Sequence, residues 1–299
     1  MFVRQLHYLV AVAREGHFGR AAQACHVSQP TLSAGLRKLE EELGVPLVMR
    51  GHRFLGLTDH GVRVLAWAQR IVADYDGLKQ EISGPGAGLS GTLRIGAIPT
   101  ALPALPPLVN AFCASHPLVR VTLLALPSAA ILRGLDEMEI DAGVTYLAEA
   151  PPARCRALAL YDESYVLITA QPGLRDAAAV TWAEAARLPL CLLTPDMQNR
   201  QIIDRLFADA GVSASPRIEA NSIAGLWSLI RSGLWSGIVP AAESARFGDA
   251  GGLRAIPLSA PRHVQPVGLL VSDRDPPAPV VTAFLRTARG HPLEMAGAR

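Results

Sequence analysis

Hydrophobic residues recur every three or four positions through the first 83 residues, a spacing that predicts a helical N-terminal region. Leu6, Leu9, Val10 and Ala13 fall on one face of a first helix, and no signal-peptide cleavage pattern follows them. Two shorter helices are predicted within residues 18–43. The second of these places four leucines at spacings of four, three and four, namely Leu32, Leu36, Leu39 and Leu43. We therefore expect these leucines to be buried in a small helical core.

A tight turn separates the two short helices. Ala21, Ala22 and Cys25 are small enough to let another helix pack closely on the first. Ser28 lies where an N-cap belongs, and Pro30 follows in the first turn, where a missing N–H costs little. The outward face of the second helix carries the candidate DNA contacts Gln29, Pro30, Thr31, Ser33, Arg37 and Lys38. Such a face suits a major groove, and the alternative is a helical hairpin with a solvated polar face.

Residues 45–57 predict a short two-stranded wing. Arg50, His52 and Arg53 lie close together between apolar residues, so the wing would bring cations to the sugar-phosphate backbone. A loop with solvated arginines is the alternative. We expect Arg50 and Arg53 to contact DNA.

A single long helix is predicted from Thr58, a candidate N-cap, to Ser83. At 1.5 Å per residue its length is about 39 Å. Its narrow apolar stripe comprises Leu65, Ala68, Val72, Tyr75, Leu78 and Ile82. A stripe of this kind predicts a partner helix, and core packing within one chain is the alternative. The glycine-rich residues 84–91 that follow predict a flexible joint and a domain boundary.

After residue 91 the pattern changes to strands that alternate with helices, which indicates parallel sheet in an α/β fold. Strands are predicted at 92–98, 119–126, 140–146, 164–170, 188–194, 215–220, 237–240 and 264–271. Helices are predicted near 102–115, 128–135, 181–187, 199–210, 222–232 and 277–290. So many strands in about 210 residues predict two lobes.

The N-terminal motif resembles the DNA-binding domain of LysR-type transcriptional regulators. The matching positions are Ala21, Ala22, Val27, Ser28, Gln29, Pro30, Thr31, Leu32, Ser33, Leu36, Leu39, Glu40, Leu43, Gly44, Pro46, Leu47, Arg50, Leu57, Thr58 and Gly61. The resemblance extends more weakly over the remaining chain. It implies a winged helix-turn-helix at 1–57, a dimerisation helix with its hinge at 58–91, and an effector-binding domain at 92–299. In that domain, a fold like that of periplasmic binding proteins is implied, with lobe one at 92–161 and 266–299 and lobe two at 162–265.

Charge and composition agree with a DNA-binding N-terminal region. Residues 1–88 hold ten Arg and Lys against eight Asp and Glu, whereas the rest of the chain is balanced at eighteen of each. The positive balance therefore lies with the predicted helix-turn-helix. Four cysteines without a CxxC pair predict neither a zinc site nor a disulfide framework, and they favour a reducing cytoplasm. No apolar run approaches the roughly 20 residues of a membrane span.

Ligands of open α/β sheets bind at the carboxyl ends of strands, against helix N-termini. The polar residues at those positions are Thr100, Ser128, Thr145, Tyr146, Thr194, Asn199 and Asn221. For Ser128 and Ser222, helix capping is an alternative to ligand binding that the sequence supports about equally well. Thr100 is the strongest candidate, because the resembling family commonly uses this position for its effector.

The sequence carries no phosphate-binding glycine loop, HExxH or GxSxG, so neither a cofactor nor a metal is expected. We predict a cytoplasmic regulator that binds double-stranded DNA as a homodimer, with a homotetramer implied by the resemblance, and not an enzyme. The alternative is a soluble α/β binding protein or an enzyme that uses the same cleft, although neither needs residues 1–60. The hydroxyl-rich helix starts suit a small carboxylate. A similarity to the LysR subgroup found beside formate dehydrogenase genes makes formate, or another one-carbon or short organic acid, the expected effector.

Overall fold

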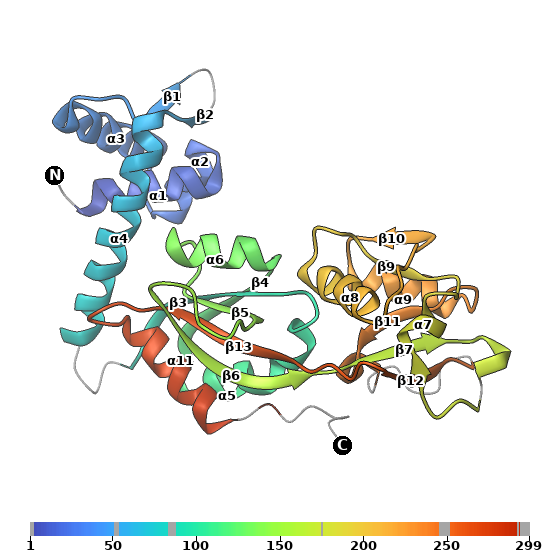
Figure 1. Ribbon diagram of the computed structural model, residues 1–299. Coiled ribbons are helices and arrows are strands. Elements are labelled where there is room, and N and C mark those ends of the chain that lie inside the picture. The colour runs from blue at the N-terminus through green and yellow to red at the C-terminus, as the bar shows by residue number, and fades with distance from the viewer. Residues whose placement is uncertain are drawn as a thin grey trace.

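The computed structural model describes residues 3–50, 54–82, 88–174, 176–244, 252–291 and 293. Figure 1 shows three parts in a row: a helical N-terminal part, a first α/β lobe reached through a long helix, and a second lobe beyond it. Within the described residues, no helix is both long enough and apolar enough to cross a membrane.

The N-terminal part packs three helices, α1 (Val3–Glu15), α2 (Phe18–Ala24) and α3 (Gln29–Leu43), on one hydrophobic core. Leu32, Leu36 and Leu39 are fully buried there, as the spacing predicts. Leu43 is 40% exposed, so the expectation that it is buried was wrong. It is the last residue of α3, and the chain turns away at Gly44, whose φ of 69° lies in the left-handed region.

The wing is an antiparallel hairpin of β1 (Val48–Arg50) and β2 (Phe54–Leu57). Glu40 of α3 holds its base, because one carboxylate oxygen accepts the backbone N–H groups of Leu47 and Val48 at 2.9 and 3.2 Å. Residues 51–53, which include His52 and Arg53, lie outside the described residues, so their expected positions stay predictions.

The long helix α4 (Asp59–Ile82) begins directly after Thr58. The Thr58 hydroxyl accepts the Gly61 N–H at 2.9 Å and donates to the Pro46 carbonyl at 2.6 Å. A Cβ on Gly61 would lie 2.0 Å from the Leu47 carbonyl oxygen, so only glycine allows the helix to approach the wing this closely. Much of the helix beyond the N-terminal core presents apolar side chains to solvent, including Tyr75, Leu78 and Ile82.

Lobe one is built on a five-stranded sheet in the order β4-β3-β5-β13-β6. Its strands are β3 (Ser90–Ala97), β4 (Leu118–Ala125), β5 (Ala142–Tyr146), β6 (Cys155–Glu163) and β13 (Gln265–Ser272). Its helices are η1 (Leu102–Ala104), α5 (Pro106–Ser115), α6 (Ser128–Asp136) and α11 (Pro279–Gly290). β3, β4 and β5 run parallel, and β13 runs antiparallel to β5 and β6.

Lobe two contains a four-stranded sheet in the order β11-β7-β12-β8 and a parallel pair, β10-β9. Its strands are β7 (Tyr165–Thr169), β8 (Val180–Thr181), β9 (Cys191–Leu193), β10 (Ile218–Ala220), β11 (Gly237–Pro240) and β12 (Arg254–Ser259). Its helices are η2 (Pro172–Leu174), α7 (Trp182–Ala185), α8 (Gln198–Asp209), α9 (Ile223–Arg231) and α10 (Ala241–Ser244). The chain crosses between the lobes after β6 and again before β13, as Figure 1 shows.

Four differences from the predicted elements concern strands. β3 begins at Ser90, inside the stretch predicted as a flexible joint, because it pairs with β4 from its first residue. β6, β8 and β12 were not predicted, since each is defined by pairing with a distant strand and not by local alternation. β6 forms one of the two crossovers, so it matters for the site described next.

Candidate DNA-binding surface and effector cleft

Helix α3 presents the polar face that the sequence predicts. Ser28 caps it in extended backbone, with its hydroxyl oxygen accepting the Thr31 N–H at 3.3 Å. Of the six candidate contacts on this helix, Ser33 is half-buried. The other five are exposed, namely Gln29, Pro30, Thr31, Arg37 and Lys38. Because the opposite face is locked by three buried leucines, this face is rigidly oriented toward solvent.

The turn between α1 and α2 contains a helix cap that the sequence reasoning missed. His17 caps α2 through its ring Nδ1, which accepts the Gly19 N–H at 3.0 Å and the Arg20 N–H at 3.4 Å. A histidine is an uncommon cap, so ordinary capping preferences give no signal for it. Both α2 and α3 therefore begin at a side-chain cap, His17 and Ser28.

In the α/β domain, a small cavity lies between the lobes at the carboxyl ends of the strands. Thr100, Ser128, Tyr146 and Asn199 all line it, together with Gln198 at the start of α8. The cavity measures about 10 Å³, which is the space of a single water molecule. No charged side chain lines it among the described residues. The cleft is therefore closed and neutral at its surface.

Tyr146 is the centre of the hydrogen bonds around this cavity. Its hydroxyl donates to a carboxylate oxygen of Glu163 at 2.8 Å and accepts from the Asn199 side-chain amide at 3.1 Å. The Thr100 hydroxyl lies 3.2 Å away and must donate, because the single proton of Tyr146 is already given to Glu163. Residues from lobe one, from a crossover strand and from lobe two thus share one network.

Glu163 is the component that sequence reasoning missed. It is 3% exposed and is the last residue of β6, where the chain leaves lobe one. Burial raises the pKa of its carboxyl to about 7, with the Tyr146 and Tyr165 hydroxyls opposing that rise and Glu243 adding to it. Burial also raises the pKa of Tyr146 well above its usual value. A proton can therefore exchange on Glu163 near neutral pH.

The other predicted cleft residues divide into two groups. Thr145 is buried and donates its hydroxyl to Ser128 at 2.9 Å, so Ser128 accepts a cross-element bond. No side-chain cap bond is found at the start of α6, which argues against the capping alternative for Ser128. Thr145, Thr194 and Asn221 do not line the cavity, contrary to the expectation that every strand end would face it. Asn221 is exposed beside Ser222, and Ser222 is the N-cap of α9, as the capping alternative predicts.

The four cysteines Cys25, Cys113, Cys155 and Cys191 are all free thiols, and none lines the cavity in the described part of the chain. Burial raises the pKa of Cys25 and Cys155, and it raises that of Cys191 to about 11. At neutral pH these three are therefore protonated and poorly nucleophilic.

A capped helix-turn-helix with a wing, joined by a long helix to a two-lobed domain with a closed cleft, defines a DNA-binding regulator with a ligand-sensing domain. The chain belongs to the LysR family of such regulators. Residues 3–62 match the family model "Bacterial regulatory helix-turn-helix protein, lysR family", and residues 86–292 match "LysR substrate binding domain". This confirms the expected family and fold class, and it identifies the chain as a transcriptional regulator and not an enzyme.

Individual relatives are similar along nearly the whole chain. The "Hydrogen peroxide-inducible genes activator" of Pectobacterium carotovorum subsp. carotovorum is 30% identical over 278 residues, with 92% of each chain covered. The "DNA-binding transcriptional dual regulator OxyR" of Escherichia coli (strain K12) is 30% identical, with 92% of this chain and 91% of the relative covered. A full-length OxyR variant from Pseudomonas aeruginosa superposes with a TM-score of 0.81 at 26% identity, covering 100% of both chains.

Proposed function

We propose that α3 enters the major groove of operator DNA, where Gln29, Ser33 and Arg37 contact base edges and neighbouring phosphates. Pro30, Thr31 and Lys38 border the same face. What supports this is the exposed polar face on a helix whose other side is fully buried. Amide side chains at the N-terminal end of such a helix suit base edges, and cations further along suit phosphates.

The wing has a different role in this proposal. Arg50 at the end of β1 and Arg53 just after it bind the sugar-phosphate backbone. Arg50→Ala should then weaken binding to all duplexes about equally and make the salt dependence less steep by about one unit of slope. Binding isotherms at several salt concentrations, with one operator duplex and one scrambled duplex, measure this. A change in the preferred sequence would contradict the wing assignment.

We also infer that α4 pairs two subunits, so that the active form is a homodimer or a homotetramer. Its outer half presents Tyr75, Leu78 and Ile82 to solvent at 38%, 52% and 74% exposure. Val72, by contrast, packs against the N-terminal core. Tyr75→Glu together with Leu78→Glu should therefore dissociate the pair without disturbing that core. Light scattering at micromolar concentration tests this, and a monomeric wild-type chain would contradict it.

The effector that we propose is a small organic acid, with formate as the simplest member, acting in the cytoplasm. A carboxylate would accept hydrogen bonds from the Thr100 hydroxyl and the Asn199 amide, which both donate to Tyr146 in the present structure. The effector would replace Tyr146 as their acceptor and so change the contact between lobes. The observation that carries this proposal is that Thr100, Tyr146 and Asn199 share one network across a cavity of one-water size.

The names of the curated relatives favour hydrogen peroxide as a second candidate. Peroxide is small and neutral, and the neutral cavity lining would accept it. The cavity has no lining cysteine among the described residues, so peroxide would bind here without the thiol chemistry that Cys residues provide.

A DNase footprint of operator DNA separates the two effectors. We expect formate to change the wild-type footprint and hydrogen peroxide to leave it unchanged. Thr100→Val keeps the side-chain shape but removes the hydroxyl, so it should abolish the formate response while effector-free DNA affinity stays the same. A footprint that changes with hydrogen peroxide but not with formate would show that peroxide, and not formate, is the effector. A formate response that survives in Thr100→Val would place the sensing site elsewhere.

A further inference from the structure

A second cavity, of about 540 Å³, lies between the N-terminal part and lobe one. It is enclosed by α1, α4, the beginning of β3, the end of β13 and the first turns of α11. Its size falls within the range of pockets that bind small molecules. We propose that this interdomain cavity is a second ligand site, which binds an organic monocarboxylate with an apolar body, of the size of benzoate.

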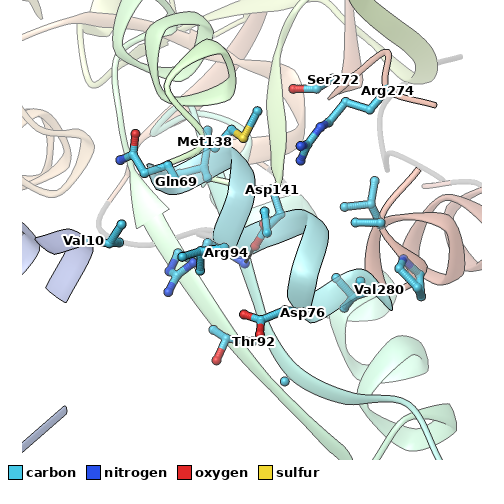
Figure 2. Close-up of a pocket in the computed structure, with 18 of the residues that line it drawn as sticks. Val10, Gln69, Asp76, Thr92, Arg94, Met138, Asp141, Ser272, Arg274 and Val280 are labelled. Atoms are coloured by element: carbon cyan, nitrogen blue, oxygen red, sulfur yellow. Dashed lines mark hydrogen bonds between the residues drawn. The ribbon is translucent and has the colours of Figure 1, made fainter. Parts of the chain in front are cut away.

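The lining contains partners for both parts of such a ligand, the carboxylate and the apolar body. Figure 2 shows Arg94 and Arg274 reaching the cavity from opposite sides, with Thr92 and Ser272 beside them. Apolar lining residues come from several elements around the cavity, with Val10 and Val280 on opposite sides of it in Figure 2; they are Val10, Val72, Val271, Val280, Val281 and Leu285. Guanidinium groups bind carboxylates through paired hydrogen bonds, and these apolar side chains would surround the apolar body.

Cations outnumber carboxylates among the residues that line the cavity. Five cations line the cavity, namely Arg14, Lys79, Arg94, Arg156 and Arg274. Only two carboxylates do so among the described residues, Asp76 and Asp141. Asp76 lies 3.9 Å from the His7 ring, and Asp141 already accepts the backbone N–H of Arg94 at 2.7 Å. Burial raises the pKa of Asp141, with the charges of Arg94 and Arg274 opposing that rise.

Three of the cations have carboxylate partners that a ligand can displace. Arg274 pairs with Asp74 of α4 at 2.7 Å, and the Asp74 side chain is 67% exposed. Ion pairs with such an exposed partner contribute little to stability. Arg14 and Arg156 likewise pair with Glu15 and Asp273 near the surface. A bound carboxylate would therefore take Arg274 from Asp74 at little cost.

This exchange has a structural consequence. The Arg274–Asp74 pair joins lobe one to the long helix that carries the DNA-binding part. A ligand that separates the pair changes how firmly α4 is held against lobe one. Thr92 and Arg94 lie near the amino end of β3, whereas Thr100 follows its carboxyl end, about 20 Å away. The interdomain site is thus separate from the cleft and does not depend on the effector proposed for it.

The test uses the full-length chain and benzoate as the probe, with binding followed by isothermal titration calorimetry. Wild type should bind benzoate, and Arg94→Gln or Arg274→Gln should weaken binding about tenfold or more. Arg286→Gln is the matched control, since Arg286 is exposed on α11 outside the cavity lining. Thr100→Val should leave benzoate binding unchanged, because Thr100 belongs to the cleft.

Asp74→Asn should increase the affinity for benzoate, whereas the two arginine variants decrease it. It removes the competitor for Arg274 from an exposed position, so the fold is retained and benzoate should bind about two- to fivefold more tightly. The proposal is overturned if wild type shows no binding at about 10 mM benzoate, if Asp74→Asn weakens binding, or if both arginine variants bind like wild type. It is also overturned if Thr100→Val abolishes binding, since the benzoate would then occupy the cleft.

Discussion

Helix α3 and the cleft between the lobes hold polar residues in opposite environments. On α3 five of the six candidate contacts are exposed and Ser33 is half-buried, and all six belong to one continuous stretch of ten residues on a face fixed by leucines on the other side. In the cleft, Thr100, Tyr146, Glu163 and Asn199 are each at most 6% exposed and come from four separate parts of the chain. A polar group at the surface costs little, whereas a buried one must be hydrogen-bonded. The cleft residues therefore depend on one another, and the helix residues do not.

The largest effect that separates the two regions should come from Glu163→Gln. The folded-state pKa of Glu163, about 7, lies above its ordinary value of 4.5. Its contribution to stability is therefore complete below pH 4.5 and is lost as the pH rises through 7, by roughly 3 kcal/mol. The glutamine variant stays neutral, so its free energy of unfolding should exceed that of wild type at pH 8 and lose this pH dependence.

Urea unfolding at pH 5 and pH 8 measures the difference. Asp162→Asn is the matched control, because Asp162 is the exposed neighbour of Glu163 on the same strand. If Glu163→Gln and wild type changed in parallel between the two pH values, the buried network would not be linked to a proton.

The next largest effect tests whether a residue on α3 can be changed without affecting the stability of the fold. Gln29→Ala should reduce the preference for operator over random duplex by about 1–3 kcal/mol if the amide makes one bidentate base contact. Because Gln29 is exposed and caps nothing, stability should not change. Competition binding with operator and scrambled duplexes measures the preference. Glu41→Ala, exposed on the same helix but further along, should leave the preference as in wild type.

Much of the N-terminal part was predictable because its signals are local. The Ser28 cap and the burial of Leu32, Leu36 and Leu39 follow from spacing along one helix. The fold class of the C-terminal domain followed from the alternation of strands and helices. The network around Tyr146 could not be predicted, because its members meet only when two lobes and a crossover strand have formed. For the same reason, the sequence could not show that Asn199 lies in the cleft while Asn221 does not.

The smallest expected effect is that of Asn221→Ala, which we compare with Asn199→Ala. Asn199→Ala removes a buried donor to Tyr146 and should abolish the formate-dependent footprint. Asn221→Ala should leave the footprint unchanged and alter stability by no more than about 0.5 kcal/mol, because Asn221 is an exposed residue outside the cavity lining. Loss of the response in Asn221→Ala would mean that the lobes close differently around the effector.

The closed cleft also determines how fast the regulator can respond. A cavity of about 10 Å³ holds no molecule larger than water, so an effector can occupy it only after the lobes separate. Lobe motions of this kind occur in microseconds to milliseconds. When the open form is rare, apparent affinity falls in proportion to its population. The association rate should then reach a plateau at high effector concentration, and that plateau would equal the rate at which the lobes separate.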